Sequence, residues 1–204
     1  MSPADNREPP AHVTRADREK LLGQHACVVW LTGLSGSGKT TIARSLEVRL
    51  ADAGRLSAVL DGDLIRTGLN RGLGFSEQDR QENIRRIAEV ARLLIDTGVI
   101  AIVSVISPTE AMRDSARQII GAGDLLLVYV RCPLEVCQQR DVKGLYGKAR
   151  AGQLPQFTGI GAPYEPPRSP DIVIDTDRKS VQEAVDLLLA ALADRQPAPA
   201  ALLP

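Results

Sequence analysis

Residues 33–40, Gly-Leu-Ser-Gly-Ser-Gly-Lys-Thr, constrain the fold of this chain more than any other part of it. The run follows a β-branched stretch at 27–32, which predicts a strand, and opens a segment at 39–53 that predicts a helix ending at Gly54. A glycine-rich turn between a strand and a helix directs backbone amides toward one point, at the positive end of the helix dipole. In this context the pattern is that of a P-loop and predicts a site for the phosphates of a nucleotide.

Each part of the run has a predicted role in holding ATP and Mg²⁺. Lys39 carries a mobile charge suited to the β and γ phosphates, and the Thr40 hydroxyl is suited to Mg²⁺. The plain alternative is a glycine- and serine-rich turn without a ligand, and the strand and helix on its two sides argue against it. The predicted nucleotide-binding residues are Gly33, Leu34, Ser35, Gly36, Ser37, Gly38, Lys39, Thr40 and Thr41.

Strand and helix signals alternate along the rest of the chain. Further strands are predicted at 56–60, 99–106, 125–130 and 171–175, and further helices at 77–96, 111–120, 133–140 and 181–192. Such alternation predicts an α/β fold, a P-loop NTPase three-layer sandwich with a mainly parallel five-stranded sheet and helices on both faces. We expect ligands at the carboxyl ends of the strands.

Composition limits the domain count and the partners. With 204 residues, the chain is expected to hold one domain at 25–193, after a tail and lead-in helix at 1–24 and before a disordered tail at 194–204. Lys and Arg total 25, as do Asp and Glu, which argues against nucleic acid as a partner. An apolar leader or membrane span is not apparent, and three cysteines without metal spacing indicate free thiols in a reducing compartment, the cytoplasm. We therefore expect no membrane partner.

Two acids flank a glycine after the second strand, at Asp61-Gly62-Asp63. A Ras-type Asn-Lys-x-Asp run is absent, and the strand at 99–106 is followed by Ser107-Pro108 rather than by a carboxylate. Acids placed opposite a P-loop strand can hold a hydroxyl acceptor and take its proton, which favours a small-molecule kinase. The alternative is an N-cap at Asp63, and both hold together if Asp61 is functional while Asp63 caps.

The next segment carries a candidate acceptor site. Arg66 lies just beyond Asp63, and Phe75 precedes a helix that Ser76 is expected to cap, with Arg80 and Asn83 on one helix face. An arginine for an oxyanion, an amide and an aromatic ring suit an anionic, purine-like molecule. Taken alone, such a segment is more often a solvated amphipathic helix.

These motifs resemble the adenylylsulfate kinase (APS kinase) family. The resemblance rests on GLSGSGKTT at 33–41, DGD with Arg66, GLGFSEQDRQENIRR at 72–86, ISP at 106–108 and CPLEVCQQRDVKGLYGKARAGQLPQFTGIGAPYEPP at 132–167. It covers most of residues 25–176. It implies a transferase that phosphorylates the 3′-hydroxyl of adenylyl sulfate with ATP and Mg²⁺ in sulfate assimilation, yielding 3′-phosphoadenylyl sulfate (PAPS), and a homodimer. A sulfurylase is a candidate partner.

The resemblance also implies roles for individual residues. Lys39, Asp61 and Ser107 would be catalytic, with Asp61 as the base or orienting acid, Thr40 on the metal and Arg140 stacked on the ATP adenine. A lid at about 143–168 would bring Lys143 over the phosphates. The residues implied for adenylyl sulfate are Asp63, Arg66, Phe75, Arg80, Asn83, Ile106, Ser107, Lys143 and Phe157. For Ser107 we favour positioning over a phosphoserine intermediate, because in-line transfer between two bound nucleotides needs none.

The chain departs from the family pattern at Leu64, at Thr109-Glu110-Ala111-Met112, at Gly147 and at Gly161. These departures put lid closure and substrate affinity in question more than the reaction. They leave two alternatives, which are a related kinase for another small hydroxyl acceptor and a nucleotide-binding regulatory domain without turnover. Stabilisation by ATP, and then by ADP with adenylyl sulfate, would separate them, since a regulatory domain would respond only to the first.

Overall fold

The fold places five strands between two layers of helices, as the sequence predicts. The computed structural model describes residues 12–154 and 156–195, so most of the two predicted tails lies outside the described residues. The elements in chain order are α1 (Arg15–Leu22), β1 (Val28–Thr32), α2 (Lys39–Asp52), β2 (Ser57–Asp61), α3 (Gly62–Thr67), α4 (Glu77–Asp96), β3 (Ile100–Ser104), α5 (Glu110–Ile120), β4 (Leu125–Arg131), α6 (Leu134–Arg140), α7 (Leu145–Arg150), β5 (Ile172–Asp175) and α8 (Val181–Asp194).

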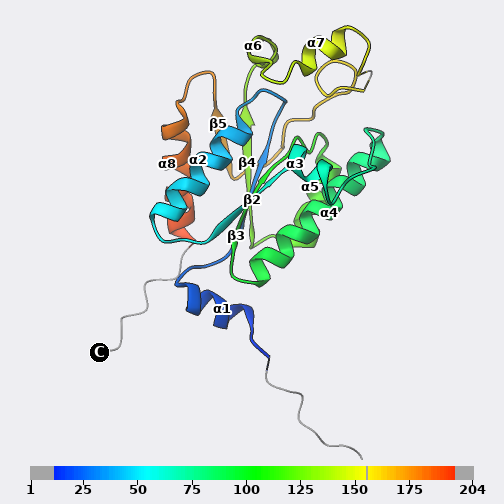
Figure 1. Ribbon diagram of the computed structural model, residues 1–204. Coiled ribbons are helices and arrows are strands. Elements are labelled where there is room, and N and C mark those ends of the chain that lie inside the picture. Colours follow the sequence, from blue (N-terminus) through cyan, green and yellow to red (C-terminus); the bar gives the residue numbers. More distant parts are fainter. Residues whose placement is uncertain (1–11, 155, 196–204) are drawn as a thin grey trace, which may run out of the picture.

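The sheet is parallel throughout, with strand order β2-β3-β1-β4-β5. Helices α2 and α8 cover one face, and α4 and α5 cover the other (Figure 1). The three central strands are almost wholly buried, because a parallel sheet with helices on both faces shields both sets of alternating side chains from water. Helices α6 and α7 lie at one end of the sheet and α1 at the other (Figure 1).

The longest helix shows how local sequence sets these elements. Ser76 caps α4 by accepting a hydrogen bond from the Asp79 amide, and the helix runs to Asp96, the bounds that its apolar repeat predicts. Ile84, Ile87 and three other buried apolar side chains form the stripe that packs on the sheet. The position of α4 brings the residues of its first turns to the carboxyl end of β2.

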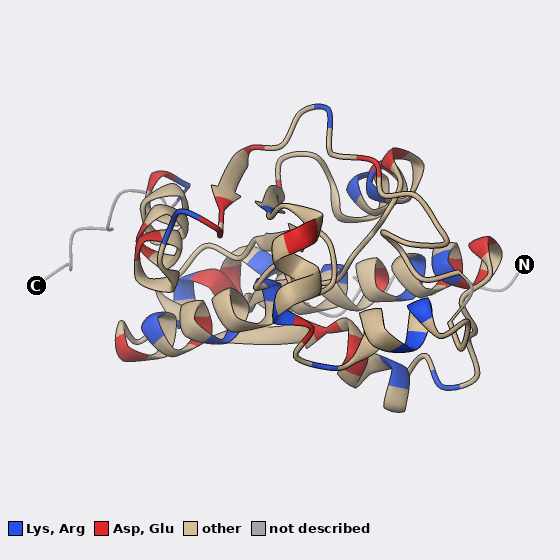
Figure 2. Cartoon of the chain, turned by 90° about the horizontal axis from the view of Figure 1, so that it is seen from above, with Lys and Arg blue, Asp and Glu red and all other residues tan. Residues whose placement is uncertain are grey.

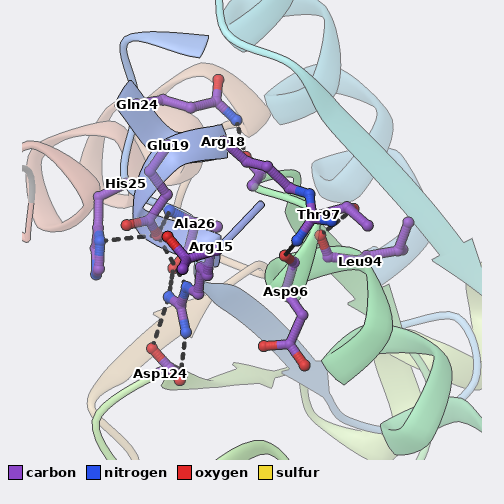
Figure 3. Close-up of polar contacts among 12 residues, drawn as sticks. Arg15, Arg18, Glu19, Gln24, His25, Ala26, Leu94, Asp96, Thr97 and Asp124 are labelled. Atoms are coloured by element: carbon purple, nitrogen blue, oxygen red, sulfur yellow. Dashed lines mark hydrogen bonds and ion pairs between the residues drawn. The ribbon is translucent and has the colours of Figure 1, made fainter. Parts of the chain in front are cut away.

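Helix α1 is the expected lead-in helix, and a polar network fixes it to the amino ends of the strands (Figure 3). Arg15 donates to both carboxylate oxygens of Asp124, at 2.8 and 2.9 Å, and Glu19 accepts from the Ala26 amide and contacts His25. The contact with Asp124 raises the pKa of the Arg15 guanidinium. This end of the molecule therefore holds structural ion pairs.

Two local features differ from expectation. The strand predicted at 99–106 is shorter, Ile100–Ser104, because the chain turns sharply around Ser107. Helix α3 was not predicted, since it begins directly at the end of β2.

Basic and acidic positions are mixed along the helices (Figure 2), in keeping with their equal numbers. Within residues 12–154 and 156–195, the helices are all too short or too polar to cross a bilayer.

Candidate active site

The turn between β1 and α2 has the backbone of a phosphate cradle. A Cβ on Gly33 would lie 2.4 Å from the Val130 carbonyl oxygen, and one on Gly36 would lie 2.8 Å from that of Cys137. Gly36 also has φ +76°, in the left-handed region that favours glycine. The glycines are thus required for the loop to approach β4 and α6 closely.

Lys39, the first residue of α2, is held over this loop. Its Nζ donates to the carbonyl oxygens of Gly33 at 2.9 Å and Leu34 at 2.7 Å. The residue is 8% exposed, and burial lowers the pKa of its ammonium group to about 8. A desolvated cation at a helix N-terminus is well suited to an anionic ligand.

Two hydroxyl oxygens and one carboxylate oxygen lie close together beside Lys39. Thr40 Oγ1 donates to Asp61 Oδ2 at 2.8 Å and lies 3.4 Å from Ser104 Oγ. Magnesium prefers such a site, with a hydroxyl, one carboxylate and room for water and phosphate oxygens, so the residues present fit Mg²⁺. In the part of the chain that the structure describes, clusters of three or more His, Cys, Asp or Glu that could hold a metal are absent.

The two acids after β2 have distinct surroundings. Asp61 is buried and caps α3, because its Oδ1 accepts from the amides of Asp63 at 3.0 Å and Leu64 at 3.4 Å. The predicted N-cap at Asp63 is therefore wrong, since α3 begins one residue after Asp61 and takes that carboxylate as its cap. Asp63 is exposed and forms an ion pair with Lys143.

These groups line one cleft of about 850 Å³ at the carboxyl ends of the strands. The predicted site residues on its lining are Ser35, Gly36, Gly38, Lys39, Thr40, Thr41, Asp61, Asp63, Phe75, Arg80, Ile106, Arg140, Lys143 and Phe157. The predicted residues that lie off the lining are Gly33, Leu34, Ser37, Arg66, Asn83 and Ser107. Leu64, 109–112, Gly147 and Gly161, the departures from the family pattern, are also not on the lining.

Arg80 connects the acceptor side of the cleft to the segment predicted as a lid. It donates to the carbonyl oxygen of Phe75 at 2.8 Å, to Thr158 Oγ1 at 2.5 Å and to the Gln156 carbonyl oxygen. It thereby joins the two segments that carry Phe75 and Phe157. Burial, and then the neighbouring Arg66 charge, lower the pKa of the Arg80 guanidinium.

Arg66 and Asn83 have protein partners instead of a place on the lining. Arg66 stacks on Phe75, with its Cζ 4.5 Å from the ring centroid, and donates to the Leu73 and Gly74 carbonyl oxygens. Asn83 is buried, and its Oδ1 accepts from Asn70 Nδ2 at 2.9 Å. The two side chains therefore shape the wall behind Phe75 and Arg80.

Two further residues differ from their expected environments. Arg140 lines the cleft, but its guanidinium is bound to Thr176 and to the Gly36 carbonyl oxygen. Ser107 is 1% exposed, and its hydroxyl donates to Thr32 Oγ1 at 2.9 Å while accepting from the Trp30 indole at 3.1 Å. The Ser107 hydroxyl thus points into the core beneath the loop, and a contact of Ser107 with the substrate stays a prediction.

Sequence reasoning missed several lining residues. Thr158 lies in the segment predicted as a lid, whereas Thr176, Lys179 and Val181 follow β5 or begin α8. Thr176 Oγ1 donates to the Ser37 carbonyl oxygen at 2.8 Å and so braces the P-loop. The one available signal was position, since residues that follow a parallel strand at its carboxyl end usually face the ligand.

Comparison with known proteins identifies the family. The adenylylsulphate kinase profile matches residues 25–175. A probable adenylyl-sulfate kinase of Halalkalibacterium halodurans is 55% identical over 182 residues, which are 89% of this chain and 90% of that protein. An adenylyl-sulfate kinase of Bacteroides thetaiotaomicron is 55% identical over 177 residues, 87% and 88% of the two chains.

A solved structure agrees. The Mycobacterium tuberculosis APS kinase CysC in complex with AMPPNP and APS matches with a TM-score of 0.80 and 44% identity, covering 83% of this chain and 98% of that one. The profile match at residues 25–175 includes the P-loop, the acids after β2 and the segment predicted as a lid. The chain belongs to the adenylylsulphate kinase family.

Proposed function

We propose that this chain transfers the γ-phosphoryl group of ATP to the 3′-hydroxyl of adenylyl sulfate, giving ADP and 3′-phosphoadenylyl sulfate. The observation that carries the proposal is the contact of Thr40 Oγ1 with Asp61 Oδ2, 2.8 Å, at the mouth of a P-loop. A carboxylate there is next to the phosphates that the loop would hold and opens onto the cleft lined by Phe75 and Arg80. The family assignment supports this substrate over a sugar acid and supports an enzyme over a regulatory domain.

On the donor side, the amides of residues 35–40 would bind the β and γ phosphates, and Thr41 would extend this contact at the start of α2. Lys39 would leave the carbonyl oxygens of Gly33 and Leu34 and bind the γ-phosphate, and full charge on its ammonium group would then be favoured. Thr40 and Asp61 would hold Mg²⁺, which when bound neutralises charge that builds up on the phosphate oxygens.

On the acceptor side, Asp61 is oriented before substrate arrives. Two amides of α3 fix its Oδ1, so Oδ2 remains directed at Thr40 and the cleft. The carboxylate would accept the proton of the 3′-hydroxyl as that oxygen bonds to the γ-phosphorus and the bond to ADP breaks. Orientation of the hydroxyl is its second contribution, since positioning supplies much of the acceleration in phosphoryl transfer.

The remaining lining groups suit the rest of adenylyl sulfate. Arg80 and Lys143 would bind the phosphate and sulfate, with Arg66 and Asn83 supporting from the second layer, and Phe75 and Phe157 would enclose the adenine. Ile106 would pack against the same nucleotide, Asp63 would release Lys143 to it, and Arg140 would stack on the ATP adenine. The lid at 143–168 would close over both nucleotides and exclude water, limiting hydrolysis of ATP.

A coupled ADP-release assay tests the proposal. Mg-ATP is supplied with and without adenylyl sulfate, and the product is identified by mass. ADP that forms only with adenylyl sulfate, together with a 3′-phosphorylated product, is the expected result. ATP binding without product, or product with another hydroxyl acceptor only, would contradict it.

We also propose a homodimer in the cytoplasm, with adenylyl sulfate supplied by a sulfurylase. The three cysteines, Cys27, Cys132 and Cys137, are free and buried, which suits a reducing compartment. Light scattering after size exclusion tests the dimer, and co-purification with a sulfurylase tests that partner.

A further inference from the structure

A buried arginine under the 106–108 loop has no part in the chemistry described so far. Arg113 lies on α5 and is 3% exposed. Its Nη1 donates to the Ser107 carbonyl oxygen at 2.7 Å, and its Nη2 donates to Glu110 Oε2 at 2.5 Å and to the Glu165 carbonyl oxygen at 2.7 Å. A buried cation is stable only when such partners surround it, so these acceptors fix the position of the guanidinium.

One of these contacts holds a strained turn. Ser107 has φ +39°, in the left-handed region that residues other than glycine rarely adopt. Its hydroxyl is bound between Trp30 and Thr32, and Arg113 takes its carbonyl oxygen. Such a conformation persists only where the surroundings over-determine it. The turn directs the preceding residue, Ile106, onto the cleft lining.

The same guanidinium contacts the C-terminal base of the lid. The Glu165 amide donates to the Pro108 carbonyl oxygen at 2.8 Å, and the Glu110 amide donates to Glu165 Oε2 at 2.8 Å. Tyr164 places its hydroxyl 3.0 Å from Thr32 Oγ1. The acceptor loop and the lid base therefore share one buried network.

We propose that Arg113 is a positioning residue, which fixes the 106–108 loop and the base of the lid in the one relation that presents Ile106 to the acceptor. The effect of Arg113 on catalysis rests on the proposed function. Its connection of the 106–108 loop to the base of the lid does not. The network reaches the acceptor side of the cleft and the lid, while the P-loop residues that would hold ATP lie outside it. Loss of Arg113 therefore disturbs adenylyl sulfate and its alignment, and leaves ATP binding intact.

The test compares Arg113→Met and Arg113→Lys with Arg117→Lys, a control one helical turn further along α5. For both Arg113 variants we expect kcat to fall by up to about 100-fold, as for misplacement of a substrate by roughly 1 Å, with a raised KM for adenylyl sulfate and an unchanged Kd for ATP. Lysine is expected not to rescue, since a point charge cannot reproduce the planar fork that binds three acceptors. Arg117→Lys is expected to retain wild-type kinetics.

Amide hydrogen exchange gives a readout that needs no substrate. Arg113→Met is expected to speed exchange at the Glu165 amide, whose acceptor is Pro108, and to leave the central strand β1 unchanged. If this variant does not fold, Tyr164→Phe removes one hydroxyl from the same network and is expected to give a smaller change in the same direction. If exchange at the Glu165 amide is faster in Arg113→Met but the wild-type protein does not phosphorylate adenylyl sulfate, the proposed function is contradicted. The connection between the 106–108 loop and the base of the lid is then still supported.

The following outcomes would overturn the proposal. They are unchanged exchange at Glu165 in the folded Arg113→Met protein, wild-type kcat and KM in both Arg113 variants, and full rescue by lysine. A lowered melting temperature with unchanged kinetics would also overturn it, because Arg113 would then serve stability alone.

Discussion

Replacing Asp61 by Asn removes from the centre of the cleft one charge, and with it the carboxylate proposed both to help hold Mg²⁺ and to accept the proton of the 3′-hydroxyl. The amide oxygen of Asn can still accept from the Asp63 and Leu64 amides, and Asn caps helices about as well as Asp. The amide nitrogen would face Thr40 Oγ1, which can accept a hydrogen bond in place of donating one. The shape of the site and the cap on α3 are therefore retained.

The expected effects on stability and on turnover differ greatly in size. Exchange of a charged for a neutral hydrogen bond costs about 1 kcal/mol, which for a chain of this length lowers the melting temperature by about 2–4 °C. Loss of a general base lowers kcat by about 10²- to 10⁴-fold, equivalent to about 3–5 kcal/mol in the barrier. The P-loop keeps Lys39 and its amides, so ATP should still bind.

The assay measures kcat at saturating ATP and adenylyl sulfate, with melting temperature and ATP affinity determined on the same preparation. Asp63→Asn is the matched comparison, since it removes an equal charge two residues away. Its ion pair with Lys143 is exposed, and such pairs are worth up to about 1 kcal/mol, or about fivefold in a rate. Near-wild-type kcat for Asp61→Asn, or a larger loss for Asp63→Asn, would refute the assignment of Asp61.

Three further predictions follow from the P-loop and its surroundings. Gly36→Ala places a Cβ 2.8 Å from the Cys137 carbonyl oxygen at φ +76° and should abolish ATP binding, as measured by calorimetry. Gly54→Ala is the control, because Gly54 has a similar φ with open space around it, and this variant should bind ATP normally. The pKa of Lys39 is about 8 in the folded protein and 10.5 ordinarily, so between pH 8 and 10.5 the unfolded chain binds more protons than the folded protein. The stability of the ATP-free protein therefore rises with pH in this range. Because bound phosphate favours the charged form of Lys39, ATP affinity should fall above pH 8. ATP binding at pH 8.5 should take up a proton, which calorimetry detects as a binding heat that depends on the buffer. Release of a proton would contradict this prediction. Ser107→Ala should keep kcat within about tenfold and form no phosphoprotein with labelled ATP, because the Ser107 hydroxyl bonds only inward and the transfer needs no enzyme-bound intermediate.

Much of the fold could be predicted because its signals are local. The apolar strands and the periodic stripe of α4 lie within single segments, and a parallel sheet follows from their alternation. Helix α3 could not be predicted in the same way. Asp61-Gly62-Asp63 is symmetrical about its glycine, and only the direction in which β2 ends decides which acid caps the helix.

The candidate site, too, could be predicted only where its signals lie within short segments of the sequence. Lys39, Thr40 and Asp61 belong to short motifs and were predicted at the cleft, where the structure brings them together. Arg113 and Tyr164 were not predicted as parts of the site, since their partners are far away in the sequence, as in the contact of Tyr164 with Thr32. The Ser-Pro pair at 107–108 predicted a turn, but the direction of the Ser107 hydroxyl depends on Trp30 and Thr32 across the sheet.

The central contact of the site depends on the register of the sheet. Asp61 is paired with Ser104 at the ends of β2 and β3, and Ser104 is paired with Leu31 of β1, which leads into the P-loop. A slip of β2 by one residue would direct Asp61 to the opposite face and replace it with Leu60. The packing of β2 opposes this slip, because Val59 packs against the cluster on one face of the sheet and Leu60 against the cluster on the other, and a slip would exchange these two side chains of different shape. The same packing that stabilises the core therefore holds Asp61 within 2.8 Å of Thr40 before any nucleotide binds.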